Sequence, residues 1–437
     1  MTRKTLHYFI AFIVIVIIVA LAYWQFFLRD TTSIDTPVTE TPDQGGFSPF
    51  DRGGPRSSAT STSTQPATTT RASTATGTQL KIPALRLLSN TPVSGYGAST
   101  TGTVKTPIAS STTVVRWLDR GRGNVYEARG NTLDITTISN TVVPKMYESL
   151  WNKNLTSFMA FGISDANTIS GIWAELRARI MPKASTSTPQ VALTSLTPYE
   201  LRGKNLPSTI LTYAVSPKKD RVFMLLSEKG VGVGYIFKFD GSSPTQLFVT
   251  PLTQVNAEWP EDQTIAITTK GAASERGYLY FVDTKTGVWK KILGPLPGLS
   301  TKVSTDAKKV FISAAGSSDN VVSSIYDVTK RKGTDAVIRT LADKCAWGNT
   351  YKDVVYCAVP SQPIPGTYPD DWYRGDTSFV DKLWQVNAST NEVHLISSIV
   401  DASDRVIDAY NLGLDDRDDF IFFMNKNDLS LWSYDLK

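Results

Sequence analysis

The pattern of apolar and polar positions divides the chain into three unlike parts. Residues 8–28 read YFIAFIVIVIIVALAYWQFFL, a run without Asp, Glu, Lys or Arg. About 20 such residues are enough for a helix to cross the hydrocarbon core of a bilayer. Residues 57–78 are mostly Ser, Thr and Ala and have no apolar period. From residue 81 onward, short β-branched and aromatic runs alternate with Gly, Asp, Asn and Ser clusters, which predicts strands joined by tight turns.

One short theme recurs along residues 81–437: a few apolar residues, a polar turn and then a β-rich run. The residue before the turn is, in order, Trp117, Phe161, Val215, Trp259, Val303, Trp347 and Leu412. The intervals are 44, 54, 44, 44, 44 and 65 residues, and the two long intervals each contain an insertion. Second hairpins follow the theme, as at 235–248, 278–293 and 383–396. This period predicts an all-β fold, a seven-bladed β-propeller of four-stranded blades. Two stacked β-sandwiches are the alternative, although they require no fixed period.

The last repeat supplies three strands, and the fourth is expected from the other end of the domain. Residues 82–89, IPALRLLS, resemble the outer strands of the other repeats. An open ring would leave the backbone groups of an edge strand unpaired. We therefore predict that residues 82–89 pair with the strand at 431–437 and complete the seventh blade.

The repeats carry a resemblance to a known family. The segment VSPKKDRVF at 215–223, followed by Tyr235 and Ile236, resembles the TolB-type propeller repeat. In that repeat an aromatic residue precedes Ser-Pro-Asp-Gly and a strand of basic and apolar residues. Residues 259–262 and 303–306 are degenerate copies, and the Gly-His and Trp-Asp pairs of the standard WD repeat do not occur. The resemblance covers most of residues 82–437 and implies the propeller fold and envelope-associated binding, but no particular partner.

The charges beside the apolar run predict its orientation. Arg3 and Lys4 precede the run, whereas Arg29 is offset by Asp30 and Asp35. By the positive-inside rule the N-terminus is cytoplasmic and the propeller lies outside, as in a single-pass protein of the cell membrane. Residues 1–30 are then a cytoplasmic tip and transmembrane anchor, residues 31–80 a disordered Ser/Thr/Pro-rich linker, and residues 81–437 the propeller. A cleaved signal peptide ending at residues 20–22 is the alternative, and it also exports the remainder.

Composition excludes several classes of function. The 45 basic and 40 acidic side chains give a net charge of +5, which is too small over 437 residues to indicate nucleic-acid binding. Two histidines and two cysteines cannot form the usual zinc-finger, haem-attachment or iron–sulfur patterns. We therefore expect no metal and no cofactor.

The two cysteines flank one predicted turn at equal distances in the sequence. Cys345 and Cys357 lie symmetrically about Tyr351, so a hairpin centred there places them opposite each other. An exported domain permits a disulfide, which would contribute at most about 3 kcal/mol across so short a loop. Two buried free thiols are the alternative.

Candidate functional residues lie mainly in the insertion at 360–376, which is rich in Pro and aromatic residues. Trp372, Tyr373 and Arg374 are of the types that dominate protein interfaces, and long loops on rigid scaffolds often bind. Alternatively, the loop folds over a propeller face and buries its own aromatic rings. The acidic residues at 415–419 are either calcium ligands or a solvated turn. Glu258 and Glu261 are a candidate pair for glycoside chemistry.

These features together predict a membrane-anchored binding or scaffold module for a protein, peptide or glycan at the cell envelope. The alternative is a propeller hydrolase or lyase that uses carboxylates at the central channel. A third possibility is an assembly module that contacts other proteins through its rim. Carboxylates converging on an axial pocket would favour the enzyme, and an exposed aromatic patch around Trp372 would favour binding.

Overall fold

The computed structural model describes residues 81–101, 112–163, 168–180, 197–316, 320–363 and 365–437. These residues belong to one compact unit, which spans 78–437. The expected anchor at 1–30 and the expected linker at 31–80 lie outside the described residues.

The localisation prediction is corrected by the helices that the structure describes. These are α3 (Asp370–Arg374), α4 (Ile399–Ser403) and the 3₁₀ helix η1 (Ala342–Lys344). Five helical residues extend about 8 Å, against roughly 30 Å for a bilayer core. Across the described ranges, no helix has both the length and the apolar character needed to cross a membrane. A single-pass membrane protein is therefore not supported, and the apolar run at 8–28 is outside the described part.

Five of the sheets contain four antiparallel strands each, and four of these five are built from consecutive strands. The first is β2 (Val93–Thr101), β3 (Thr112–Asp119), β4 (Val125–Arg129) and β5 (Ile135–Ser139). Another is β14 (Val255–Glu261), β15 (Thr264–Thr269), β16 (Arg276–Asp283) and β17 (Trp289–Pro297). It is followed by β18 (Ser300–Val303), β19 (Lys309–Ala315), β20 (Val321–Asp327) and β21 (Lys332–Asp335). Then come β22 (Cys345–Trp347), β23 (Val354–Pro360), β24 (Asp381–Asn387) and β25 (Val393–Ser398).

The sixth sheet has eight strands in two groups of four. One group is β6 (Glu148–Trp151), β7 (Ser157–Ile163), β8 (Ile169–Ala178) and β9 (Tyr199–Asn205). The other is β10 (Ile210–Val215), β11 (Arg221–Glu228), β12 (Val231–Lys238) and β13 (Thr245–Thr250). A single residue pair, Ile169 with Ile210, joins β8 to β10. The groups are thus two ordinary antiparallel meanders whose backbones pair at one point.

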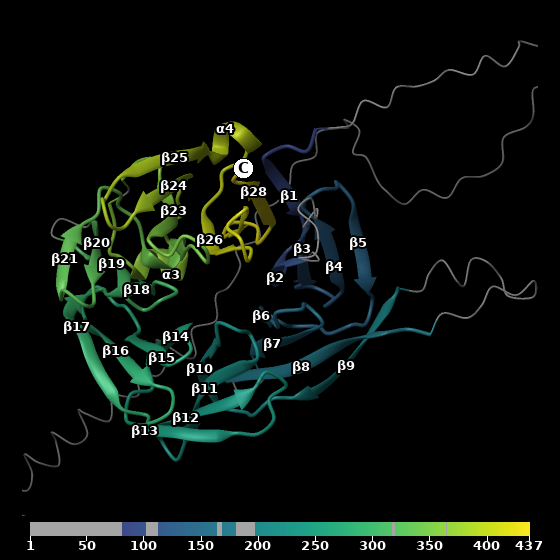
Figure 1. Cartoon of the computed structure of the whole chain (residues 1–437), viewed down its shortest axis with the longest axis horizontal. Helices are drawn as coiled ribbons and strands as arrows, with labels where there is room; N and C mark the ends of the chain where they lie inside the picture. The colour runs from purple at the N-terminus through teal and green to yellow at the C-terminus, as the bar shows by residue number, and fades with distance from the viewer. Residues whose placement is uncertain (1–80, 102–111, 164–167, 181–196, 317–319, 364) are drawn as a thin grey trace, which may run out of the picture. The chain divides into compact units, whose positions relative to one another are not determined.

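The sheets follow one another around a central axis (Figure 1). Successive four-stranded antiparallel meanders arranged in this way define a β-propeller. The predicted all-β propeller fold is therefore confirmed, and the β-sandwich alternative is wrong.

The ring closes by pairing the two ends of the folded unit. Strand β1 (Leu85–Ser89) adds to β28 (Leu431–Asp435), which continues through β27 (Phe420–Asn425) to β26 (Ala409–Leu414). The register places Leu85 opposite Tyr434 and Leu87 opposite Trp432. The predicted closure is confirmed.

Apolar side chains fill the spaces between neighbouring sheets. Phe161 of β7 stacks on Tyr213 of β10 with ring centroids 3.7 Å apart. In the next space, Phe223 of β11 belongs to the same buried cluster as Trp259 of β14. Strands alternate their side chains between two faces, so each sheet contributes to the core on both sides. The core is therefore divided into layers around the ring.

Polar contacts between neighbouring sheets repeat with the period of the sequence. Lys218 pairs with Asp262, and Lys309 pairs with Asp353, each across 44 residues. In each pair the two residues are one 44-residue interval apart and lie in adjacent sheets. The interval of the sequence is therefore also the repeat of the structure.

The first two copies of the sequence theme fall on a different hairpin from the rest. Trp117 lies on β3 and Phe161 on β7, the second strands of their sheets. Val215, Trp259 and Val303 lie on the first strands β10, β14 and β18. Both hairpins of a sheet show apolar runs around a polar turn, so the pattern alone does not distinguish them.

Candidate functional site

A polar cavity lies where the first strands of several sheets converge on the axis. Its volume is about 450 Å³. Its lining includes Glu148 of β6, Glu258 of β14, Lys302 of β18 and Asp343 of η1. Residues of β2, β22 and β26 complete it, so six sheets contribute. We call it the axial cavity.

Three carboxylates face the axial cavity, and each has a hydrogen-bond donor. The Tyr213 hydroxyl donates to Glu148. Asp343 Oδ2 accepts from Ser300 Oγ at 2.5 Å and from the Tyr373 hydroxyl at 2.9 Å. Glu258 Oε2 accepts from the backbone N–H of residue 303 at 3.3 Å. Donors of this kind hold the carboxylate oxygens in fixed positions.

Burial raises the pKa of Glu258. Removal from water disfavours the charged form of a carboxyl group. Lys302 Nζ lies 3.9 Å from Glu258 Oε2 and opposes the rise. Cationic groups thus also reach the cavity, and the Arg120 guanidinium lies 4.5 Å from the centre of the Tyr147 ring.

The insertion does not present its predicted binding residues as one exposed patch. Trp372 is only 4% exposed, and its remaining surface lines the axial cavity. Tyr373 is 41% exposed and reaches Asp343 through its hydroxyl. Arg374 forms ion pairs with Asp371 and Asp376. Trp372 therefore follows the alternative in which the insertion buries its own aromatic rings, and ligand binding by Trp372, Tyr373 and Arg374 stays a prediction.

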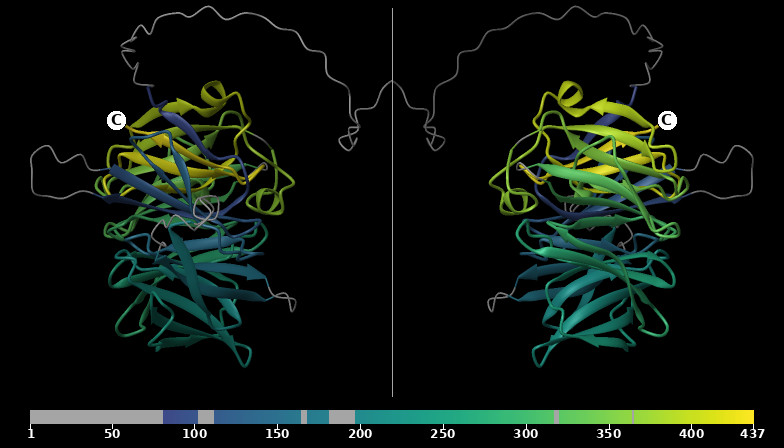
Figure 2. Two further views of the ribbon diagram at one scale, coloured as in Figure 1. Left: turned by 90° about the vertical axis from the view of Figure 1, so that its right-hand side faces the viewer. Right: turned by 90° about the vertical axis from the view of Figure 1, so that its left-hand side faces the viewer.

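The physical reason for this burial is that the insertion folds back over the ring. Helix α3 projects from one face of the ring in the side views (Figure 2). Tyr368, Trp372 and Phe379 form a small apolar cluster with Leu341. The insertion thus covers its own aromatic rings.

Beneath the insertion lies a charged cluster that the sequence did not indicate. The side chains of Lys344, Asp381 and Asp408 are all fully buried. Lys344 Nζ is 2.8 Å from Asp381 Oδ2, contacts Asp408 Oδ1, and donates to the Ala409 carbonyl at 2.9 Å. The three ionisable residues are 64 positions apart at most (408 − 344) and have no motif spacing, so only the folded chain reveals them. We call them the buried triad.

The insertion is anchored to this triad. Trp372 Nε1 donates to Asp408 Oδ2 at 2.9 Å, and the backbone N–H of Phe379 donates to the same oxygen at 3.1 Å. The rings of Trp372 and Phe379 each lie 5.2 Å from Lys344 Nζ. Asp408 therefore holds the insertion in place over the first strands.

The triad predicts how stability depends on pH. Burial raises the pKa of Asp381 to about 6, with Lys344 opposing and Asp408 reinforcing the rise. Because the folded-state pKa exceeds the unfolded one, this residue stabilises the fold fully below about pH 4 and ceases to do so as pH rises through about 6. We expect its contribution to fall by about 2 kcal/mol between pH 4 and 7. Urea unfolding of the wild type and of Asp381→Asn at both pH values measures it. An equal pH dependence in the two proteins would contradict the assignment.

Cys345 and Cys357 lie opposite each other on β22 and β23, with their sulfur atoms 2.09 Å apart. Both are buried in the layer between the β18–β21 and β22–β25 sheets. The bond therefore ties the innermost strand β22 to its neighbour beside the axial cavity, which Cys345 also lines.

The acidic turn at 415–419 joins neighbouring sheets. Asp415 Oδ2 accepts from Thr113 Oγ1 at 2.6 Å and from Thr100 Oγ1 at 3.0 Å. Asp418 Oδ2 accepts from the backbone N–H groups of Thr350 and Tyr351 at 2.9 and 3.0 Å. Among the residues that the structure describes, no group of acidic, His or Cys side chains could hold a metal ion. This turn is neither the calcium site nor the solvated turn that the sequence allowed.

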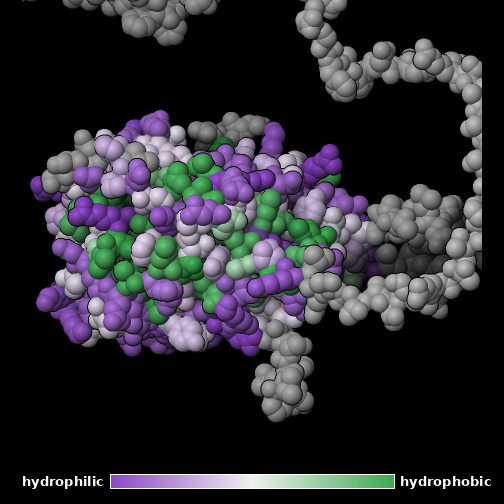
Figure 3. All heavy atoms as spheres, turned by 90° about the horizontal axis from the view of Figure 1, so that it is seen from above, coloured by the Kyte–Doolittle hydropathy of each residue, from purple (hydrophilic) through white to green (hydrophobic). Residues whose placement is uncertain are grey.

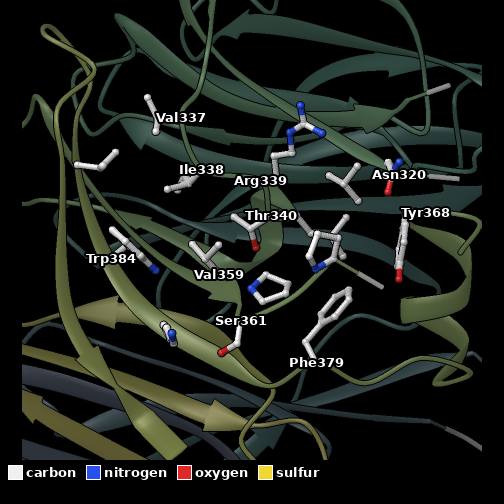
Figure 4. A pocket seen from close by; sticks show the side chains of 16 residues that line it. Asn320, Val337, Ile338, Arg339, Thr340, Val359, Ser361, Tyr368, Phe379 and Trp384 are labelled. Atoms are coloured by element: carbon white, nitrogen blue, oxygen red, sulfur yellow. The ribbon is translucent and has the colours of Figure 1, made fainter. Parts of the chain in front are cut away.

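A second cavity, of about 370 Å³, lies beside the insertion and is mainly apolar (Figure 4). Its labelled lining includes Ile338, Val359, Tyr368, Phe379 and Trp384. The groups that face the axial cavity are ionisable, whereas those facing this one are mostly hydrocarbon. Arg339 and Lys382 are the ionisable residues of its lining, which includes no carboxylate, whereas three carboxylates line the axial cavity.

The outer rim shows apolar patches between polar side chains (Figure 3). Leu395 on β25 and Val406 before β26 are 41% and 56% exposed. Scattered apolar side chains of this kind are ordinary on protein surfaces and do not define an assembly face.

The strand topology and the axial cavity define a β-propeller protein. No protein-family model matches the sequence, and no curated protein matches it. Solved structures do match. TolB from Acinetobacter baumannii has a TM-score of 0.38 at 10% identity, covering 68% of this chain and 78% of TolB. The β-propeller domain of the Trilobed protease from Pyrococcus furiosus has a TM-score of 0.37 at 11% identity, covering 62% and 73%.

An oligogalacturonate lyase from Vibrio parahaemolyticus matches with a TM-score of 0.43 at 8% identity, covering 79% of this chain and 98% of the lyase. The chain is thus similar to TolB and to other β-propeller proteins, in agreement with the TolB-type resemblance of its repeats. Such low identities and TM-scores say nothing about function, and the fold itself rests on the strand topology.

Proposed function

We propose that this chain is a seven-bladed β-propeller that binds a polar segment of a peptide or glycan in its axial cavity. The blade count follows if the two meanders of the eight-stranded sheet are taken as two blades beside the five four-stranded sheets. The observation that carries the binding role is the convergence of ionisable side chains from separate blades on one axial cavity.

The chemistry of the lining indicates the kind of ligand. Glu148, Glu258 and Asp343 offer acceptors, whereas Arg120 and Lys302 offer donors, within about 450 Å³. Ligand sites typically combine such a volume with a few fixed polar groups that set orientation. A segment with both donors and acceptors, such as a sugar unit or a polar peptide loop, matches this lining.

The insertion is proposed to form one wall of the site. Trp372 supplies an apolar surface to the cavity, and Tyr373 fixes Asp343. Arg374 points its charge at Asp371 and Asp376 and has no such role. Of the predicted binding residues, Trp372 therefore lines the cavity, Tyr373 holds a carboxylate of its lining, and Arg374 lies in surface ion pairs.

Catalysis is the second candidate, and one observation favours it. Glu258 has a raised pKa, and the charge of Asp343 contributes to the rise. A carboxyl group whose pKa is raised by burial, in one cavity with a second carboxyl group, is an arrangement used for acid–base cleavage of glycosides. The same cavity would then serve a hydrolase or lyase.

The test is binding of the full chain to a glycan array and a peptide library, with wild type and Asp343→Asn compared. A lost charge-assisted hydrogen bond costs about 1.5–3 kcal/mol, so we expect the hits to weaken at least about 10-fold. Glu392→Gln, which changes an exposed carboxylate on the β24–β25 turn, is the control and should bind like wild type.

Three outcomes are informative in this experiment. Equal binding by wild type and Asp343→Asn, or no hits at all, contradicts the axial site. Release of shortened products that stops in Glu258→Gln would establish the hydrolase or lyase in place of simple binding.

A further inference from the structure

Asp408 alone accepts the hydrogen bonds that anchor the insertion, so Lys344 and Asp381 are ionisable groups of the buried triad without a part in that anchoring. Its three side chains have no exposure to solvent, yet they are ionisable. If all three were charged they would carry one net negative charge in the interior, which is costly. Asp381 Oδ1 is buried and has no hydrogen-bond partner among the described residues, so only Oδ2 of this carboxyl group contacts Lys344.

We propose that Lys344 and Asp408 form an intramolecular isopeptide bond, with Asp381 as the catalytic acid and base. Lys344 Nζ and the Asp408 carboxyl group are in contact, and Lys344 Nζ is also 2.8 Å from Asp381 Oδ2. The three groups needed to join an amine to an acid therefore meet at one point.

The reaction needs a neutral amine and a neutral acid, and it would take place at side chains that are fully buried from solvent. The rings of Trp372 and Phe379 lie over Lys344 Nζ, and burial raises the pKa of Asp381. In such a site a proton can pass from the ammonium group to the Asp408 carboxylate, which leaves a neutral amine beside a neutral acid.

The donors on Asp408 prepare its carboxyl carbon for attack. Trp372 Nε1 and the backbone N–H of Phe379 both donate to Asp408 Oδ2. They would stabilise the negative charge that develops on this oxygen when the amine adds. Groups held in contact react with effective concentrations far above those in solution, about 10⁵ M or more.

The step balances without any co-reactant. The Lys344 nitrogen attacks Cγ of Asp408, and a C–N bond forms. Asp381 accepts a proton from that nitrogen and delivers its own to the departing Asp408 hydroxyl. The C–O bond breaks, one water molecule leaves, and Asp381 ends in its starting protonation state. The product is an amide between η1 and the residue that precedes β26.

The intact mass of the wild-type full chain tests the bond, measured after reduction of the disulfide. We expect a mass below that of the sequence by one water molecule. Trypsin should fail to cleave after Lys344 and should yield a branched peptide that joins residues 340–352 to residues 406–417. The branched peptide distinguishes the isopeptide from loss of water within a single peptide.

An unmodified mass, with residues 340–344 and 406–417 released as separate peptides, would overturn the proposal. This measurement needs no variant, so misfolding cannot obscure it. Asp381→Asn tests the catalytic residue, and we expect it to keep the full sequence mass. Complete cross-linking in Asp381→Asn would show that Asp381 is not the acid and base.

Discussion

Replacing Leu85–Ser89 with five Gly and Ser residues is expected to destabilise the propeller more than any other change of this length. The replacement removes strand β1, so the backbone groups of β28 lose their partners. It also removes Leu88, which is 2% exposed and packs with Phe422 and Met424. Loss of one buried leucine costs about 2–5 kcal/mol, so with the strand pairing we expect more than about 5 kcal/mol. Differential scanning calorimetry should show a Tm lower by on the order of 10 °C.

The matched control replaces residues 60–64, in the Ser/Thr-rich segment, with Gly and Ser of equal length. Its Tm should equal that of the wild type. Hydrogen exchange of the β28 amides adds a local measurement, since these amides should exchange faster only when β1 is replaced. An unchanged Tm after replacement of β1 would show that closure does not hold the ring together.

Lys344→Met is the second change with a large expected effect. It removes the only cation that contacts Asp381 and Asp408 among the described residues, and leaves two carboxyl groups buried side by side. Breaking a buried ion pair from one side costs about 3–5 kcal/mol, because the remaining charge is uncompensated. The substitution also prevents the proposed amide bond between Lys344 and Asp408, so the loss is expected to be at least this large. Urea unfolding at pH 7 measures this loss.

The triple variant Lys344→Met, Asp381→Asn, Asp408→Asn provides the comparison. It removes the charges while keeping similar side-chain volumes, so part of the lost stability should return. Lys330→Met, at an exposed lysine, controls for the substitution and should unfold like wild type. Equal stabilities of Lys344→Met and wild type would show that the triad contributes nothing to the fold.

The fold was largely predictable because each repeat has the same local pattern of apolar runs and polar turns in the sequence. The turns recur every 44 residues, and the ion pairs Lys218–Asp262 and Lys309–Asp353 follow the same interval. The assignment of hairpins failed at Trp117 and Phe161, since both hairpins of a sheet have the same alternation of apolar runs and polar turns. Closure through residues 82–89 was predictable from edge chemistry alone.

The site was far less predictable. Glu148, Glu258 and Asp343 are more than 80 positions apart in sequence, and nothing local distinguishes them from turn residues. Tryptophan is a residue type common at binding surfaces, but packing of the insertion onto Asp408 buries Trp372. Long-range packing decides such features, and a single sequence does not record it.

The pairing of β1 with β28 means that the ring can close only after β28 has been synthesised. Leu85 and Tyr434 are 349 residues apart (434 − 85), although they are neighbours in the finished sheet. Contacts of such separation form late, because a long stretch of chain must be arranged before they are gained. On the ribosome, a nascent chain that ends before β28 keeps β1 without a partner. The ring therefore stays an open arc until β28 has emerged from the ribosome, and only then can it close.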